Sequence, residues 1–232
     1  MIEIVEQYKE EGYYIFRNLY SKEYCNELKE YLNTLEVKRY IPFSNIPWGW
    51  GNLLDKGPFT KITENKIFNK FCKKLFKSDN YIFPNMMINN KASWIGPEVE
   101  WHREIYPKSH IINDLPYENI VDSNFGHKRR VSSEAMKKVN TLCEHIYCEM
   151  EVGDMLVFTD KTVHGSNANK SPDDRKSVVL GVRHNVKKYN EEVYKKSTNY
   201  RRNFIVTELQ SVIDKIKSSN MYSDFNKEKN EV

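Results

Sequence analysis

The first half of the chain shows two helical patterns of apolar residues after a short aromatic run. The aromatic run at 12–17 predicts a short strand. Apolar positions then recur every three or four residues from Cys25 to Leu35, and Ser21 stands in front of them as an N-cap. A similar stripe predicts a second helix over about 63–76. Both apolar faces are expected to pack into a core.

The pattern changes to strands after about residue 80. Strands are predicted at 81–88, 98–104, 144–150, 155–158 and 177–183. The segment 105–131 has no clear period and is expected to be a long connection, a lid or a binding loop, followed by a short helix at about 133–139. Helical spacing returns at 190–216. We expect one mainly β domain with flanking helices over 1–217, and a frayed polar tail over 218–232.

Composition narrows the class of protein. The 232 residues carry a net charge of +4, too mild and too dispersed to predict nucleic-acid binding. No apolar run approaches the ~20 residues that cross a bilayer, and the start lacks the apolar region of a signal peptide. The four cysteines form no CxxC pair. These features predict a cytoplasmic protein with reduced thiols and a small-molecule partner, away from membranes, whose segment 190–216 could serve as a homodimer surface.

Two motifs carry candidate chemistry. The first is the tetrapeptide Trp-His-Arg-Glu at 101–104, in which His102 and Glu104 occupy alternate strand positions and so share a face. In the second, a Gly-Asp turn at 153–154 leads through an apolar strand to His164. Two histidines and one carboxylate are the facial triad of non-heme Fe(II) oxygenases. Arg175 follows eleven residues after His164, and its guanidinium suits the carboxylate of an acidic co-substrate.

This order of motifs resembles the phytanoyl-CoA dioxygenase-like family of Fe(II)- and 2-oxoglutarate-dependent oxygenases. The resemblance is strongest over 151–185 and around His102, and it extends loosely to the opening strand and helix. It implies a double-stranded β-helix, which is a cupin-like jelly roll. It also implies that His102, Glu104 and His164 bind the iron, and that Arg175 and Ser166 bind the distal carboxylate of 2-oxoglutarate.

The resemblance also suggests a polar co-substrate residue on the strand before His102. Asn90 is the first candidate and Lys91 the second, and the alternative is that both belong to an ordinary turn. The chain departs from the family in two places. Glu104 stands where the family usually has Asp, and the 62-residue interval between the two histidines is shorter than usual. The shorter interval is expected to affect the lid and the substrate-binding part of the site more than the metal-binding part.

The expected activity is that of a dioxygenase that uses Fe(II), 2-oxoglutarate and O2. It would hydroxylate a small polar metabolite, or one linked to a nucleotide or carrier, with release of succinate and CO2. Because a carboxylate is present at Glu104, the resemblance predicts hydroxylation rather than halogenation. Two alternatives stay open: a zinc-dependent hydrolase-type site and a non-catalytic jelly-roll binding domain. The roles of Arg183, of Trp48 and Trp50, and of the 105–131 segment also stay open.

Overall fold

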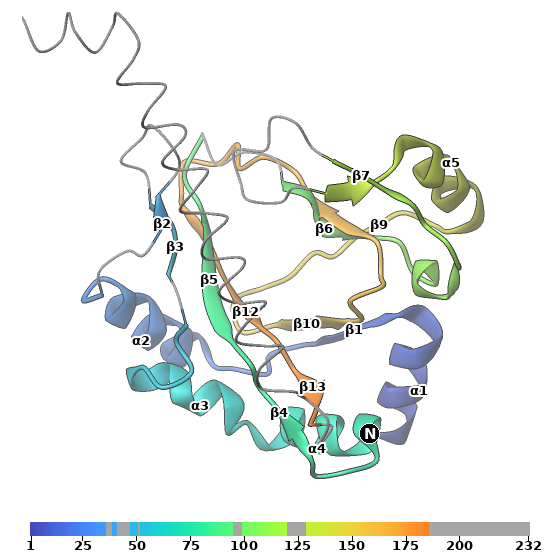
Figure 1. Cartoon of the computed structure of the whole chain (residues 1–232). Coiled ribbons are helices and arrows are strands. Elements are labelled where there is room, and N and C mark those ends of the chain that lie inside the picture. Colours follow the sequence, from blue (N-terminus) through green and yellow to red (C-terminus); the bar gives the residue numbers. More distant parts are fainter. Residues whose placement is uncertain (36–38, 41–46, 51, 95–98, 120–128, 186–232) are drawn as a thin grey trace, which may run out of the picture. The chain divides into compact units, whose positions relative to one another are not determined.

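The computed structural model (Figure 1) describes residues 1–35, 39–40, 47–50, 52–94, 99–119 and 129–185. The chain divides into a compact unit, Met1–His184, and a second unit, Asn185–Val232. The predicted helix at 190–216 and the predicted tail at 218–232 lie outside the described residues. No helix in the described ranges is both long and apolar enough to cross a membrane.

The described helices lie mostly in the first third of the chain. They are α1 (Ile2–Glu11), α2 (Lys22–Leu32), the 3-10 turn η1 (Gly57–Phe59), α3 (Thr60–Thr63), α4 (Lys66–Phe76), the 3-10 turn η2 (Ser109–Ile111) and α5 (Ser133–Leu142). Side-chain oxygens cap three of them: Ser21 accepts from the Tyr24 N–H, Asn65 from that of Phe68, and Ser132 from that of Ala135. The predicted helix after Ser21 is thus confirmed, and its cap is the predicted one.

The described strands pair antiparallel in five small sheets. Their bounds are β1 (Tyr13–Phe16), β2 (Arg39–Tyr40), β3 (Pro47–Trp50), β4 (Tyr81–Ile82), β5 (Met86–Lys91), β6 (Val99–Ile105), β7 (Tyr117–Asn119), β8 (Arg129–Val131), β9 (Ile146–Tyr147), β10 (Met155–Phe158), β11 (His164–Ser166), β12 (Arg175–Leu180) and β13 (Arg183–His184). The sheet orders are β1-β10, β11-β6-β9, β12-β5-β3-β2, β13-β4 and β7-β8. The predicted β-rich centre is confirmed, as are the helices that precede it.

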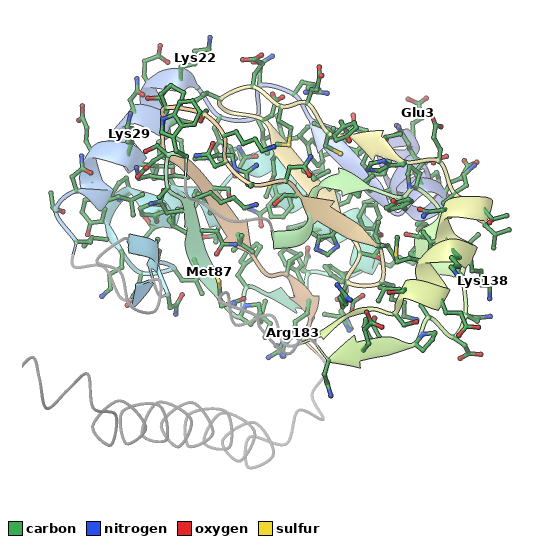
Figure 2. The ribbon with its side chains drawn as sticks, turned by 90° about the horizontal axis from the view of Figure 1, so that it is seen from above. Glu3, Lys22, Lys29, Met87, Lys138 and Arg183 are labelled. Atoms are coloured by element: carbon green, nitrogen blue, oxygen red, sulfur yellow. The ribbon has the colours of Figure 1, made fainter. Side chains whose placement is uncertain are left out.

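The two faces of β5 have different surroundings. Met86 and Ile88 are buried in a cluster with side chains of α2, η1 and α3. Helices α2 and α3 lie to one side of β5 in Figure 1. Because successive strand residues point to opposite faces, Met87, Asn89 and Lys91 turn away from these helices; Met87 is labelled in Figure 2. This second face of β5 is called the inner face below.

Two sequence expectations differ from the structure, and one helix was not predicted. The 81–88 segment is divided into β4 and β5, separated by three residues that include Pro84, which cannot donate a ladder hydrogen bond. The 105–131 segment was expected to be a single long connection, and its described parts contain η2, β7 and β8. Glu118 of β7 pairs with Arg130 of β8. The pattern also gave no signal for α1, whose only buried residue is Val5.

Candidate functional site

The backbone of β6 and β11 brings the two histidine motifs together. Gly165 pairs with both His102 and Glu104, and His164 pairs with Ile105, in a register broken by a bulge. The three predicted metal ligands therefore come from adjacent positions on two paired strands. The side chains of His102 and Glu104 lie outside the described part of the structure. The described side chains alone contain no cluster of three metal-binding groups.

The imidazole of His164 is held in a defined orientation. Its Nδ1 lies 2.7 Å from the carbonyl oxygen of Thr162. Since a carbonyl only accepts, Nδ1 must carry the hydrogen of this hydrogen bond. A histidine that donates its other N–H to a backbone carbonyl is the usual form of a metal ligand. The Phe158 ring packs against the imidazole with the ring centroids 4.4 Å apart.

The two residues before His164 are fixed by buried hydrogen bonds. The Thr162 hydroxyl donates to the carbonyl of Gly12 at 2.8 Å, and the N–H of Val163 donates to the Ser109 hydroxyl at 2.8 Å. The carbonyl of Val163 accepts from the N–H of Tyr106 at 3.0 Å, just beyond the end of β6. These contacts tie β11 to segments far away in the sequence, so the start of β11 has little freedom to move.

The Gly-Asp turn before β10 has a structural role. Gly153 has φ 98°, and a Cβ there would lie 2.0 Å from the carbonyl oxygen of Tyr20. The Asp154 carboxylate accepts from the N–H groups of Asn18 and Glu151 and from Arg17. Burial raises the pKa of Asp154, but these hydrogen bonds outweigh burial and the net pKa lies below its ordinary value. The motif therefore anchors β10 to the end of β1.

Arg175 and Lys91 occupy directly opposed positions on β12 and β5. Directly opposed residues of an antiparallel pair share a face, so both belong to the inner face. Lys91 is 5 % exposed, and its ammonium donates to the Ser166 hydroxyl at 2.6 Å and to the carbonyls of Ser166 and Asn167 at 3.2 and 2.7 Å. A lysine of one sheet thus reaches a serine of another sheet.

Asn90 lies on the other face of β5. Its amide donates to the Asp174 carboxylate at 3.2 Å, and its register partner is Lys176. Burial raises the pKa of Asp174, but hydrogen bonds from the Ser93 N–H, from Asn90 and from Lys176 outweigh it, so the pKa is lowered. The role of Asn90 toward a co-substrate stays a prediction, and this position favours Lys91 over it.

Asn169 is a residue of this site that the sequence analysis did not identify. Its side chain is buried, and its amide nitrogen lies 2.9, 3.1 and 2.8 Å from the carbonyl oxygens of Lys91, Ala92 and Asp173. It connects the end of β5 to the loop that leads into Arg175. A lone Asn in a polar loop gives no sequence signal for this, because the contacts join residues 78 positions apart.

Three further residues have roles that the sequence left open. Arg183 pairs with Ile82 in the β13-β4 sheet. Trp48 and Trp50 belong to β3, and their side chains lie outside the described residues. Gly49, between them, pairs with Asn89 of β5.

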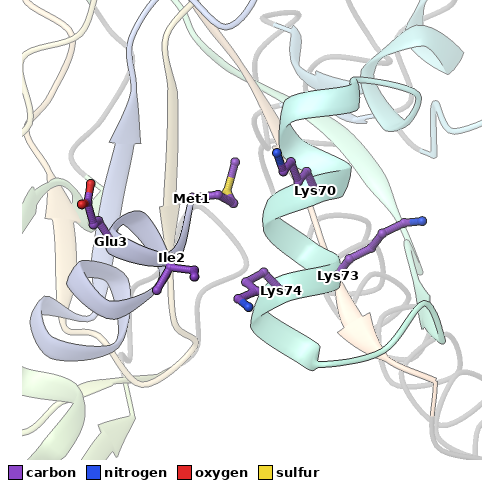
Figure 3. Close-up of a pocket in the computed structure, with 6 residues that line it drawn as sticks. All are labelled: Met1, Ile2, Glu3, Lys70, Lys73 and Lys74. Atoms are coloured by element: carbon purple, nitrogen blue, oxygen red, sulfur yellow. The ribbon is translucent and has the colours of Figure 1, made fainter.

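The described part of the chain also has an open surface pocket of about 670 Å³ between α1 and α4 (Figure 3). Its lining residues are Met1, Ile2, Glu3, Lys70, Lys73 and Lys74. None of them belongs to either histidine motif.

Comparison with known proteins supports the family resemblance. Residues 104–177, which include Glu104, His164 and Arg175, match the family model described as phytanoyl-CoA dioxygenase (PhyH). No curated protein matches the sequence.

Several solved structures share the fold at low sequence identity. EctD from S. alaskensis, solved with 2-oxoglutarate and 5-hydroxyectoine, is 14% identical, with a TM-score of 0.63 over 78% of this chain and 74% of that one. EvdO2 from Micromonospora carbonacea var. aurantiaca, complexed with 2-oxoglutarate, is 16% identical, with a TM-score of 0.57 over 78% and 89%. The epimerase SnoN, in complex with Fe3+, alpha ketoglutarate and nogalamycin RO, is 12% identical, with a TM-score of 0.57 over 78% and 82%. The family match over residues 104–177, together with the order of the two histidine motifs, supports the resemblance of this chain to the phytanoyl-CoA dioxygenase-like family.

Proposed function

We propose that this protein is an Fe(II)- and 2-oxoglutarate-dependent oxygenase with a double-stranded β-helix fold. The observation that carries the proposal is the placement of His164. Its Nδ1–H is committed to the Thr162 carbonyl, and its strand pairs with the backbone of His102 and Glu104. A histidine whose Nδ1–H is donated to a backbone carbonyl, beside a second histidine and a carboxylate, is a donor set suited to ferrous iron.

The proposed co-substrate end of the site contains groups that can bind a carboxylate. Arg175, Lys91 and Ser166 bring two cations and a hydroxyl to one region of the inner face. Such a group suits the distal carboxylate of 2-oxoglutarate. The match to EctD and EvdO2, both solved with 2-oxoglutarate, agrees with this assignment. The contact from β5 to β11 also agrees with a fold in which the two sheets face each other.

When bound, Fe(II), 2-oxoglutarate and O2 supply the oxidation, with 2-oxoglutarate converted to succinate and CO2. The chain's own residues position the reactants. His102, Glu104 and His164 hold the metal, and Arg175 with Ser166 orients the co-substrate. The aromatic ring of Phe158 covers one side of the His164 imidazole and limits its contact with water.

The proposed substrate is a small polar metabolite, or one linked to a nucleotide or carrier, to which the polar pair next to Arg175 is suited. Ser177 pairs with Asn89, and beyond them Val179 pairs with Met87. Polar and apolar pairs thus follow each other along β12 and β5. Hydroxylation is the proposed reaction, because the carboxylate of Glu104 fills the position that halogenating relatives leave without a ligand. Epimerisation is a second candidate, since the epimerase SnoN shares the fold.

The test is an anaerobic titration of metal-free protein with Fe(II) and then 2-oxoglutarate, followed by the weak visible charge-transfer band of the chelate. We expect His164→Ala to abolish the band and Arg175→Ala to require far more 2-oxoglutarate. His184→Ala, which changes an exposed histidine of β13, serves as the control. A folded wild-type protein without a band would refute the proposal, and tight zinc binding would then favour a hydrolase-type site.

Once a substrate is found, product mass separates the two candidate reactions. Hydroxylation adds one oxygen atom from O2, which ¹⁸O₂ labels. Epimerisation leaves the substrate mass unchanged.

A further inference from the structure

The pocket between α1 and α4 has a basic wall and an apolar rim. Its volume of about 670 Å³ is within the usual range of small-molecule sites. Three lysines of α4 line it together with the first residues of the chain, Met1, Ile2 and Glu3. All of these residues lie outside 104–177, the part that matches the family model. A ligand here would therefore bind apart from the two histidine motifs.

The two helices that form the pocket are held together by buried apolar contacts. Val5 of α1 is 2% exposed and lies in one cluster with Phe68, Phe71 and Cys72 of α4. The ring of Tyr8 packs edge-on against that of Phe71, with the ring centroids 5.3 Å apart. Because this packing fixes α1 against α4, the pocket is pre-formed, and a ligand does not have to order its walls.

Helix α4 has an unusual pattern of charge. It contains four lysines and no acidic residue, whereas α1, α2 and α5 each carry both signs. Lys70 and Lys74 stand four residues apart and so share one face of the helix. Two like charges at this spacing destabilise a helix. An anion bound between the two ammonium groups would offset their repulsion.

The lysines of the pocket differ in their partners. The Nζ of Lys73 lies 2.9 Å from the carboxylate of Asp79. Among the described residues, no carboxylate lies within ion-pair distance of Lys70 or Lys74. Figure 3 shows these two lysines on the side of α4 that faces α1, and Lys73 on the opposite side. Lys70 and Lys74 therefore bring two cations without ion-pair partners to the pocket.

The carboxylates of α1 do not neutralise this charge. Glu6 accepts a hydrogen bond from Lys9 at 2.8 Å. That bond and the charge of Lys9 are the main causes of the lowered pKa of Glu6, and the charges of Lys77 and Lys74 contribute least. Glu3 lines the pocket, but it forms no ion pair within the described ranges. The pocket lining thus keeps an excess of positive charge.

We propose that the pocket between α1 and α4 binds a small molecule that carries a phosphate monoester. A phosphate monoester is close to a dianion at neutral pH, so it matches two ammonium groups better than a single negative charge does. Lysine binds phosphate as a point charge. The organic part of the ligand would cover Met1 and Ile2, and the Ile2 side chain is now 62% exposed. A phospholipid head group carries the same phosphate, but a pocket of limited volume suits one soluble molecule.

Calorimetric titration of the metal-free full chain with phenyl phosphate tests the proposal. Phenyl phosphate joins a phosphate monoester to an apolar ring, and benzenesulfonate is its singly charged counterpart. We expect one site with a dissociation constant of about 1 mM or lower for phenyl phosphate, and binding of benzenesulfonate at least about fivefold weaker. Equal affinity for both ligands, or no binding of phenyl phosphate, would overturn the proposal.

Substitutions of exposed residues locate the site without disturbing the core. Lys70→Met and Lys74→Met should each weaken phenyl phosphate binding by about three- to tenfold, the loss of one ion pair at a partly exposed site. Glu3→Gln should tighten binding by about twofold, because it removes a negative charge from the lining. Lys29→Met, in the exposed part of α2 (Figure 2), is the matched control and should leave binding unchanged. An equal loss in Lys29→Met would show a response to overall charge and overturn the site.

Sedimentation with vesicles separates a soluble ligand from a lipid head group. The vesicles contain phosphatidylcholine with phosphatidic acid, and wild type is compared with the double variant Lys70→Met/Lys74→Met. We expect no sedimentation that depends on these two lysines. Sedimentation that the double variant loses, without binding of phenyl phosphate to wild type, would overturn the proposal in favour of a membrane surface.

Discussion

Replacing Asp154 with alanine tests whether the Gly-Asp motif supports the site structurally. The carboxylate accepts three hydrogen bonds: from the N–H of Asn18 at 2.8 Å, from that of Glu151 at 3.0 Å and from Arg17 at 2.7 Å. Its side chain is 1% exposed, whereas that of Arg17 is 54% exposed. The arginine can therefore rehydrate after the substitution, and its bond contributes little to stability.

The expected loss of stability in Asp154→Ala comes mainly from the hydrogen bonds of the two backbone N–H donors. A hydrogen bond to a charged group contributes roughly 1.5–3 kcal/mol, and both donors here can partly return to water, so Asp154→Ala should lower the free energy of unfolding by about 2–4 kcal/mol. Asp154→Asn should cost about half as much, because one oxygen acceptor remains. Urea unfolding at pH 7, followed by circular dichroism, measures both. Asp160→Ala, in the exposed turn after β10, is the control.

The pH dependence gives an independent check. Since hydrogen bonding lowers the pKa of Asp154 in the folded state, its contribution is fully present above the ordinary pKa of about 3.9. It is lost as the pH falls through the lower folded-state value. The difference in unfolding free energy between wild type and Asp154→Ala should therefore shrink only in acid. A loss below about 1 kcal/mol at pH 7, or an Asp154→Ala protein that is stable but no longer binds iron, would refute the structural role.

Three further predictions concern stability and the site. Gly153→Ala should destabilise the fold by about 3 kcal/mol or more in urea unfolding, since a Cβ would lie 2.0 Å from a carbonyl oxygen at φ 98°; a neutral effect would contradict this conformation. Asn169→Ala should weaken 2-oxoglutarate binding by about tenfold in the charge-transfer titration while iron still binds, because the loop before Arg175 loses its link to Lys91 of β5; unaltered affinity would count against that link. Burial raises the pKa of Tyr8 to about 12, so its contribution to stability is present below about pH 10 and is lost as the pH rises toward 12. Over that pH interval, the free energy of unfolding of Tyr8→Phe should fall less than that of wild type. An equal fall in both proteins would show that Tyr8 ionises at its ordinary pKa.

Local elements and the motif order could be read from the sequence. The strand at 155–158 and the helix after Ser21 appear with the predicted bounds or within a few residues of them. Their signals are short in range, since a cap and a run of apolar residues act within one turn or one strand. The two histidine motifs and Arg175 were recognised for a similar reason, because the order of residue types along the chain carries the family resemblance.

Contacts between distant segments could not be predicted from these short-range sequence patterns. Lys91 and Asn90 are equivalent by sequence, and the register of β5 with β12 decides that Lys91 shares the face of Arg175 while Asn90 shares that of Met86 and Ile88. A strand's register depends on pairing with residues more than 80 positions away, and a one-residue shift would exchange the two faces. The role of Asn169 could not be predicted from the sequence for the same reason, because its partners Lys91 and Ala92 belong to a distant segment. The chemistry of the site is therefore encoded in residue types along the chain, whereas the choice among neighbouring residues depends on long-range pairing that forms only in the folded protein.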